Sequence, residues 1–412
     1  MLLSLPSELL DAVVRALASE RDVQDLRSVA LVCRALLPIV RQELFKVLHV
    51  CAVYQPYMRP YFEHVVELRI SEPVNDPMDL SLLRSFYFVP FLTPTSFPKL
   101  TALHCTSLDK SFFRQFPRRF LDALVSISSV TALTLSHAWF RHPMQPKMLL
   151  SALPNLSSLS LADFEVILGV GAPAPNWPSP TTLIHPRLSR LSIQPSVWSN
   201  ASTHLCEWLA DGPAAESLAE LVVTDERGLP CTGILRHFGP SVRSLALPLR
   251  EQEDLQDCMA FYTGLRDLTV VLEAYSTAQG PWYLLAPFFV HGIAAERLER
   301  VTIDVRVRYP MALASAVDWA TLDRVNEELD EDRFGALRRV VFVLQWRAEL
   351  GWCPEWEERE TVARNVEARL HYLADAGKLE TRVQVVKEFP DAVATNKNAP
   401  GSHAHEVLPP SA

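Results

Sequence analysis

A short phrase of apolar and polar positions recurs along most of the chain. It consists of an apolar residue, two variable residues, a second apolar residue, one variable residue and a third apolar residue. Ten copies follow one another, with the first apolar position at Val65, Leu100, Val130, Leu156, Leu188, Leu218, Val242, Leu265, Leu298 and Leu337. The last two apolar positions alternate with a polar one, which is the pattern of a strand with one buried face. Each copy therefore predicts one β-strand.

The return of the phrase predicts a repeat architecture. The nine intervals between Val65 and Leu337 average about 30 residues, which is within reach of the leucine-rich-repeat period. Helix-like segments, such as those around Leu124 and Trp208, separate the copies. A single unit cannot bury its apolar edge, so neighbouring units stack and share a continuous core. We therefore expect an α/β solenoid in which residues 49–350 form an irregular leucine-rich-repeat horseshoe.

The beginning of the chain follows the helical period instead. Residues 4–48 are typical of three short helices, and the first has Leu9 and Val13 four residues apart on a broad apolar face. The second helix is expected to carry an apolar stripe from Leu26 to Leu37, with further apolar residues off that stripe. A unit of this size buries too little surface to enclose such helices. Either the rest of the chain or a partner protein must cover them.

Two motifs in this segment resemble an F-box. The first is Leu5-Pro6-Ser7-Glu8-Leu9-Leu10, and the second is the helix that ends in Val32-Cys33-Arg34. In the F-box family, the Leu-Pro and Val-Cys regions pack against the Skp-type adaptor of cullin–RING ubiquitin ligases. The resemblance covers about one tenth of the chain and implies adaptor contacts by Leu5, Pro6, Leu9, Val32 and Cys33. The chain departs from the family at Leu36, where many members have Trp.

The repeats are also similar to the irregular repeats found behind F-boxes in many fungal-type proteins. Spacings range from 23 residues, between Val242 and Leu265, to 39, between Leu298 and Leu337. The Asn or Cys that regular repeats place after the last apolar position is generally absent. We therefore expect uneven curvature and no buried Asn ladder.

The end of the chain is expected to close the array. Residues 355–373 predict a helix with Val362, Val366 and Leu370 on one face, and residues 381–386 predict a last strand. Together they suggest a C-terminal cap over residues 351–390, because repeat arrays need to cover their last apolar edge. Residues 391–412 lose the apolar periodicity, which predicts a disordered tail.

Composition and motifs argue against an enzyme. Only 13 of the 412 residues are glycine, whereas phosphate-cradling loops and strained nucleophile turns consume glycine. The sequence contains no GxSxG, GxxxxGK[ST], HExxH or GxGxxG motif. His137 and His142 lie close together in sequence, but no nearby cysteine or carboxylate completes a metal site. We expect no catalytic residues, no cofactor and no metal.

Charge and hydropathy limit the partners. The net charge is −9 and no basic run stands out, which argues against nucleic-acid binding. The longest apolar stretch, residues 284–295, is too short to cross a bilayer. The seven cysteines are dispersed, and the N-terminal segment lacks the basic region of a signal peptide. We therefore expect reduced thiols and a cytoplasmic or nuclear location.

One face of the expected sheet remains as a candidate site. Residues between the inward positions of each phrase point to the concave side. The target-binding candidates there are Ser160, Arg190, Ser192, Glu220, Asp267, Arg300 and Asp304. Small hydroxyls edged by charges could accept a protein segment, but they could equally form plain solvated sheet, because no aromatic or arginine hot spot stands out.

These features favour a substrate-recognition subunit of an SCF-type ubiquitin ligase. The N-terminal module, residues 1–48, would bind the Skp-type adaptor, and the repeats would hold an unidentified target protein. The first alternative is a leucine-rich-repeat scaffold whose N-terminal helices bind no ligase. The second is an enzyme on an unfamiliar fold, which would need a pocket with paired carboxylates or a Cys–His pair.

Overall fold

The computed structural model describes residues 9, 12–16, 26, 28, 36–50, 56–71, 92–106, 118–140, 142–166, 183–194, 201–224, 232–249, 255–274, 281–291, 293, 295–307, 316–329, 334–347 and 356–386. The chain divides into two compact units, Met1–Ala219 and Glu220–Ala412. Each unit is considered by itself below.

The described part of the first unit contains one parallel sheet in which strands follow chain order. Its strands are β1 (Val47–Val50), β2 (Glu67–Ser71), β3 (Ala102–Thr106), β4 (Ala132–Ser136), β6 (Ser158–Ala162) and β8 (Arg190–Gln194). Two further short strands, β5 (Trp139–Phe140) and β7 (Glu165–Val166), pair with each other. The direct succession of parallel neighbours is what a stack of similar units produces.

The second unit repeats this arrangement, and its last four strands are longer. Its strands are β9 (Glu220–Val223), β10 (Ser244–Pro248), β11 (Asp267–Ala274), β12 (Arg300–Val307), β13 (Arg339–Arg347) and β14 (Leu379–Val386). Each pairs in parallel with the next one along the chain. Both units are thus α/β structures, and the order of their strands is compatible with a solenoid.

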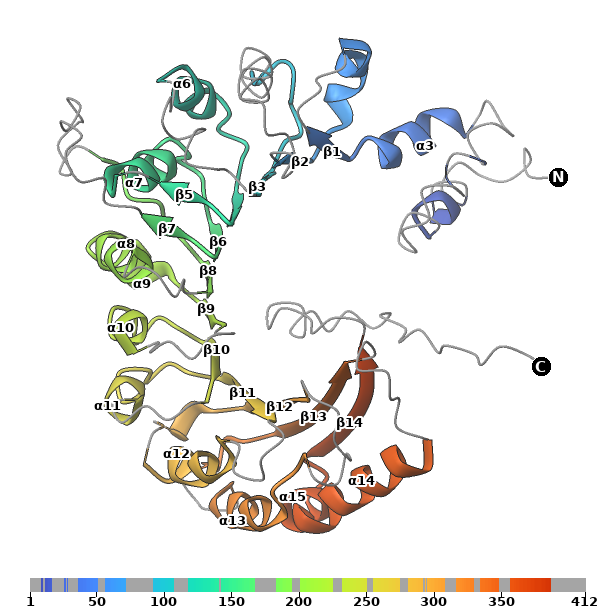
Figure 1. The fold of residues 1–412 in the computed structure, drawn as a ribbon, viewed down its shortest axis with the longest axis vertical. Helices are drawn as coiled ribbons and strands as arrows, with labels where there is room; N and C mark the ends of the chain where they lie inside the picture. The colour runs from blue at the N-terminus through green and yellow to red at the C-terminus, as the bar shows by residue number, and fades with distance from the viewer. Residues whose placement is uncertain are drawn as a thin grey trace, which may run out of the picture. The chain divides into compact units, whose positions relative to one another are not determined.

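Helical segments connect successive strands and lie on one side of the sheet in each unit (Figure 1). In the first unit they are η2 (Pro56–His64), α6 (Arg118–Ser126), α7 (Met144–Ser151), α8 (Ala201–Ala210) and α9 (Ala214–Ser217), while α3 (Leu37–Leu44) precedes the first strand. In the second unit they are α10 (Thr232–Leu235), α11 (Leu255–Met259), η5 (Pro281–Leu284), α12 (Leu285–His291), η6 (Ala295–Arg297), α13 (Trp319–Leu329), α14 (Trp356–Arg369) and α15 (His371–Asp375). The expected outer helices around Leu124 and Trp208 are confirmed as α6 and α8, where both side chains are buried.

All ten copies of the sequence phrase form strands, as expected. Every one of these strands begins two residues after the first apolar position of its phrase. That first apolar side chain is at most 2% exposed in all ten copies. It fills the space beneath the turn that enters the strand, which explains why an apolar residue recurs there although it lies outside the strand.

A backbone hydrogen-bond ladder joins the copies just before their strands. The carbonyl of Val66 accepts hydrogen bonds from the N–H groups of Thr101 (2.9 Å) and Ala102 (3.1 Å). The carbonyl of Thr101 in turn accepts from Thr131 (2.9 Å) and Ala132 (3.0 Å). The same two-donor pattern recurs through both units. Each turn therefore has fixed partners for its polar backbone groups, as buried backbone requires.

The N-terminal segment differs from its sequence prediction at two places. The predicted stripe put Leu37 on the second helix, but the chain turns at Leu36 and α3 begins at Leu37, with a proline in its first turn. Proline suits that place because the first helical N–H groups have no partner within the helix. Strand β1 also begins at Val47, inside the range expected to be helical. The phrase that starts at Phe45 has the same spacing as the ten copies and was missed.

The C-terminal elements largely confirm the expectation. The predicted helix over 355–373 is present but breaks at Leu370 into α14 and α15. Val362, Val366 and Leu370 are buried, as the pattern indicated. The last strand, β14, starts two residues before the predicted 381–386. Residues 391–412 lie outside the described residues.

No helix within the described ranges combines the length and the apolar character needed to cross a bilayer.

Candidate protein-interaction surfaces

In the first unit, the face of the sheet opposite the helices is lined by small polar side chains. Strands β3, β4, β6 and β8 share one burial pattern, in which two buried residues alternate with three half-buried ones. Ser160 lies between Thr134 and Ser192 in register across three strands. Arg190 lies on the same face, beside Ser158. The structure therefore brings the candidates Ser160, Arg190 and Ser192 together on one accessible surface.

A charged group lies on the same face, over β2 and β3. Arg69 bonds to the carboxylate of Glu67, and His104 Nε2 lies 3.4 Å from Glu67 Oε1. Burial lowers the pKa of His104, although the negative charge of Glu67 opposes that shift. His104 is the register neighbour of Thr134. The hydroxyl-lined face is therefore bordered by a carboxylate, an arginine and a neutral imidazole.

The turns after β4 and β6 have a matching conformation. His137 (φ 52°) and Asp163 (φ 49°) have backbone angles in the left-handed region, which residues other than glycine rarely adopt. The N–H of His137 donates to the carbonyl of Ala162 (2.8 Å), and His137 Nδ1 lies 3.1 Å from Asp163 Oδ2. This is the position at which regular repeats carry Asn. Two polar residues other than Asn shape these turns.

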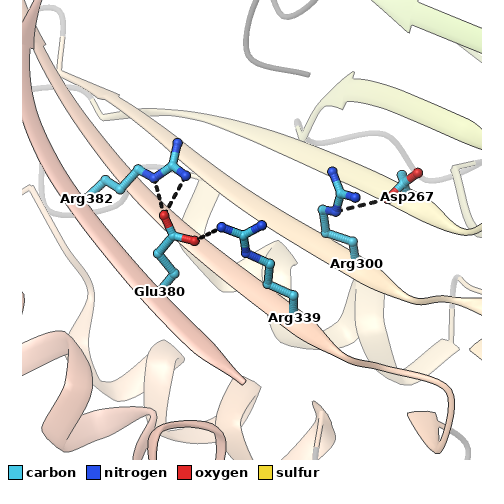
Figure 2. A network of polar contacts seen from close by, with 5 residues as sticks. All are labelled: Asp267, Arg300, Arg339, Glu380 and Arg382. Atoms are coloured by element: carbon cyan, nitrogen blue, oxygen red, sulfur yellow. Dashed lines mark hydrogen bonds and ion pairs between the residues drawn. The ribbon is translucent and has the colours of Figure 1, made fainter. Parts of the chain in front are cut away.

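In the second unit, charged residues lie along the amino-terminal ends of strands β11 to β14 (Figure 2). Arg300 Nε lies 3.2 Å from Asp267 Oδ1, which joins two residues that the sequence had singled out. Glu380 bonds to Arg339 on the neighbouring strand and, at 2.5 Å, to Arg382 on its own strand. All five side chains are between 32% and 42% exposed. The sequence analysis missed Arg339, Glu380 and Arg382, although their alternation along the strands could have indicated a shared face.

The two carboxylates of this network respond in opposite ways to their surroundings. Burial raises the pKa of Asp267, and the charge of Arg300 only partly offsets that shift. Burial also acts to raise the pKa of Glu380, but the hydrogen bonds and charges of Arg339 and Arg382 outweigh it, so the pKa is lowered. Both cases follow from the balance between desolvation and opposite charge. Glu380 is therefore held firmly in its ionised form.

Asp304 does not lie on an open surface, contrary to the expectation for a target-binding residue. It is 1% exposed, and its carboxylate accepts hydrogen bonds from Arg306 Nε (3.0 Å) and Gln345 Nε2 (2.8 Å). Burial raises its pKa, against the opposing effect of Arg306. The Oε1 atom of Gln345 is buried without a hydrogen-bond partner. Asp304 therefore belongs to a buried polar cluster.

The remaining target-binding candidate is Glu220, which starts β9 and is half-buried. Its register neighbour is Ser244, and Ser244 in turn lies beside Asp267. Glu220 thus belongs to the same row of strand-entry residues as Asp267 and Arg300. The structure brings these three candidates together along one edge of the second unit.

Of the five adaptor-binding candidates, only Leu9 is among the described residues. It is helical and 51% exposed, and Val13, four residues later, is 47% exposed. Val14 points into a cluster with Leu26, Leu36 and Val40. The candidates Leu5, Pro6, Val32 and Cys33 lie outside the described residues. The described part of this segment thus has both a buried apolar side and an exposed one.

Cys105, Cys206 and Cys258 are buried, and burial raises the pKa of the Cys105 thiol to about 12. A thiol of that kind carries almost no thiolate, which is the reactive form. Within the described ranges, no group of three metal-binding side chains comes together.

Comparison with known proteins adds no family. No protein-family model and no curated protein matches the chain. A crystal structure of a structural-genomics protein from Bacteroides fragilis is similar at 10% sequence identity and a TM-score of 0.33, over 79% of this chain and 67% of that one. A likeness this distant carries no argument about function.

Proposed function

We propose that this chain is a non-catalytic protein-interaction subunit that recruits a target to an SCF-type ubiquitin ligase. The N-terminal helices would bind a Skp-type adaptor, and the repeats would bind the target. Acceleration of the transfer would come from proximity, because the target is held near chemistry that other subunits perform. The observation that carries the proposal is the tandem array of parallel strands, which in the first unit presents a polar face of half-buried residues.

The exposed side of the N-terminal segment supports an adaptor contact. One buried apolar cluster contains Val14, Leu26, Leu36 and Val40, and Ile39 and Leu44 pack against it. That cluster leaves Leu9 and Val13 largely exposed on the other side. Two large apolar residues at helical spacing form the kind of surface that another protein covers. The F-box-like motif contributes Leu9 to the same surface.

A pull-down with a purified Skp-type adaptor tests the first half of the proposal. Changing Leu9 and Val13 to Asp should reduce capture by more than tenfold, because two apolar anchors would be lost at the centre of the contact. Changing Leu5, Pro6 and Val32 to Asp should have the same effect. Ala12→Asp is the matched control, since Ala12 is an exposed helical residue next to Val13 and offers little apolar surface.

Circular dichroism separates loss of binding from loss of folding in these variants. Unchanged capture by the Leu9→Asp/Val13→Asp protein would contradict the adaptor assignment. If the adaptor fails to bind the wild-type chain while a target still co-purifies, the chain is a repeat scaffold outside the ligase. Co-purification from cells that express the full chain identifies the target.

A further inference from the structure

The strand-entry edge of the second unit carries more cations than carboxylates. We use the name basic rim for Arg300, Arg339, Lys378 and Arg382 together with Asp267 and Glu380. Lys378 directly precedes β14, and its carbonyl accepts a hydrogen bond from the N–H of Val340 (2.8 Å). Four cations and two carboxylates give the rim a net charge of +2, whereas the whole chain has −9. The rim is therefore a local exception to the charge of the chain.

The arginines of the rim keep most of their hydrogen-bonding capacity. A guanidinium has five N–H donors. Arg300 uses Nε toward Asp267, and Arg339 uses one Nη group toward Glu380. The side chains of Arg300, Arg339 and Arg382 are 35%, 42% and 40% exposed. Several donors on neighbouring strands therefore face solvent from positions that the sheet holds fixed.

Glu380 shows what kind of group these arginines bind. Its two carboxylate oxygens are shared between Arg339 and Arg382, which approach from adjacent strands (Figure 2). Arginine pairs with carboxylates through directed, charge-assisted hydrogen bonds, so two guanidiniums that converge on one carboxylate form a preorganised donor site for another. Glu380 occupies only part of that donor site.

The spacing of the rim fits an extended acidic peptide. Neighbouring strands lie about 4.8 Å apart, and an extended chain advances about 3.3 Å per residue. A carboxylate-rich segment that crosses the strand ends can therefore reach guanidiniums on β12, β13 and β14 in turn. A nucleic acid fits less well, because Asp267 and Glu380 interrupt the cations and the rim residues include no aromatic side chain for base stacking.

We infer that the basic rim binds a carboxylate-rich segment of a partner protein. The inference rests on the proposed function in taking the second unit as a target-binding part of the chain, and it adds the chemistry of the target. Electrostatic complementarity of this kind speeds association and selects partners more than it adds affinity. The target is thus expected to present a run of Asp and Glu residues.

Fluorescence anisotropy with the full chain tests the inference. The probe is a fluorescein-labelled peptide of alternating Glu and Ser, with a peptide of alternating Gln and Ser as its reference, at low ionic strength where screening is weak. The Arg339→Gln/Arg382→Gln protein should bind the acidic peptide about five- to tenfold more weakly than wild type. The matched control is Arg324→Gln/Arg364→Gln, which removes the same charge from exposed positions on α13 and α14 and should change the Kd by less than about twofold.

A second variant has the opposite predicted sign. Glu380→Gln removes the carboxylate that competes with the peptide, so binding should tighten by about threefold. Glu367→Gln, at an exposed position of α14, makes the same charge change elsewhere and should have little effect. Equal effects of the rim and control variants would overturn the inference in favour of bulk charge, as would tighter binding of a single-stranded RNA or no binding of the acidic peptide by wild type.

The adaptor assay and the peptide assay test the ligase proposal and the basic rim separately. The Leu9→Asp/Val13→Asp protein should bind the acidic peptide as wild type does. Normal peptide binding combined with absent adaptor binding would refute the ligase proposal and leave the rim intact. Normal adaptor binding without peptide binding would refute the rim alone.

Discussion

The two units build their strands from the same phrase but differ in how far they bury the second face of the sheet, which is the face opposite the helices. In β4, β6 and β8 of the first unit, half-buried residues alternate with buried ones along the whole strand. In β11 of the second unit every residue after Asp267 is buried, and β12 is nearly the same. The first unit thus presents a broad polar face, whereas the second presents polar groups mainly at its rim.

The difference arises after the phrase ends. In the first unit a turn follows within two or three residues of the last apolar position, so the strands stay five residues long. In β11 and β13 of the second unit the sequence continues with apolar residues, Val270–Leu272 and Val340–Leu344. Continuous apolar runs are typical of strands buried on both faces. The six-residue phrase therefore determines where a strand starts. The residues that follow the phrase determine how long the strand is and whether its second face is buried.

The largest expected effect comes from placing a charge on the second face of each unit. Val271→Asp puts a carboxylate where the side chain is 6% exposed, and it should destabilise the protein by about 4 kcal/mol. Ser160→Asp makes the corresponding change on a half-buried face of the first unit and should cost about 0.5 kcal/mol. Urea unfolding followed by circular dichroism measures both. Similar losses would show that the two faces do not differ as described.

The next effect concerns the polar cluster that the second unit buries. Arg306→Met removes the charged donor to Asp304 and leaves that carboxylate buried beside the amide of Gln345. The variant should lose about 3 kcal/mol, because an uncompensated buried charge is costly. Asp304→Asn added to Arg306→Met should restore about half of the loss. Additive effects in this double-mutant cycle, measured by urea unfolding, would contradict the pairing.

A smaller effect is expected from a hydroxyl ladder that only the first unit has. Thr101, Thr131, Ser157 and Ser189 each follow the first apolar residue of a phrase, and each hydroxyl donates to the carbonyl of the preceding copy. Ser157→Ala removes a 3.2 Å bond to Thr131 and should cost about 0.5–1 kcal/mol. The second unit has Arg266 at this place, and Arg266→Ala should cost less, since its ion pair with Glu299 is exposed. An equal or larger loss from Arg266→Ala in thermal unfolding would argue against the ladder.

The sequence was sufficient to predict the strands because their signal is local. The buried first residue, for example Leu188, and the alternation in Leu191 and Ile193 mark a strand without knowledge of its neighbours. Strand β1 was missed because Phe45 also fits the end of a helix. Its phrase is distinguished only by pairing with β2, a contact between residues about twenty apart.

The candidate sites were harder to predict because accessibility depends on more than periodicity. Asp267 and Asp304 share one face of the sheet by register, yet the first is half-buried and the second is 1% exposed. The partnership of Arg339 with Glu380 joins residues 41 apart. No pattern within one strand contains that information. Charged residues on neighbouring strands therefore become a site only once the register is known.

The smallest expected effect separates the units by pH. The folded pKa of His104, in the first unit, lies below its ordinary value of 6.5, so the unfolded chain takes up a proton first and stability falls as the pH drops below that value. The folded pKa of Glu380, in the second unit, lies below its ordinary value of 4.5. The stability that Glu380 contributes is therefore present above that value and lost as the pH falls toward the folded pKa. His104→Gln should flatten the stability profile only in the upper window and Glu380→Gln only in the lower one, with modest amplitudes because solvent screens both groups. Urea unfolding across this pH range measures both slopes, and a single shared window for the two variants would refute the assignment.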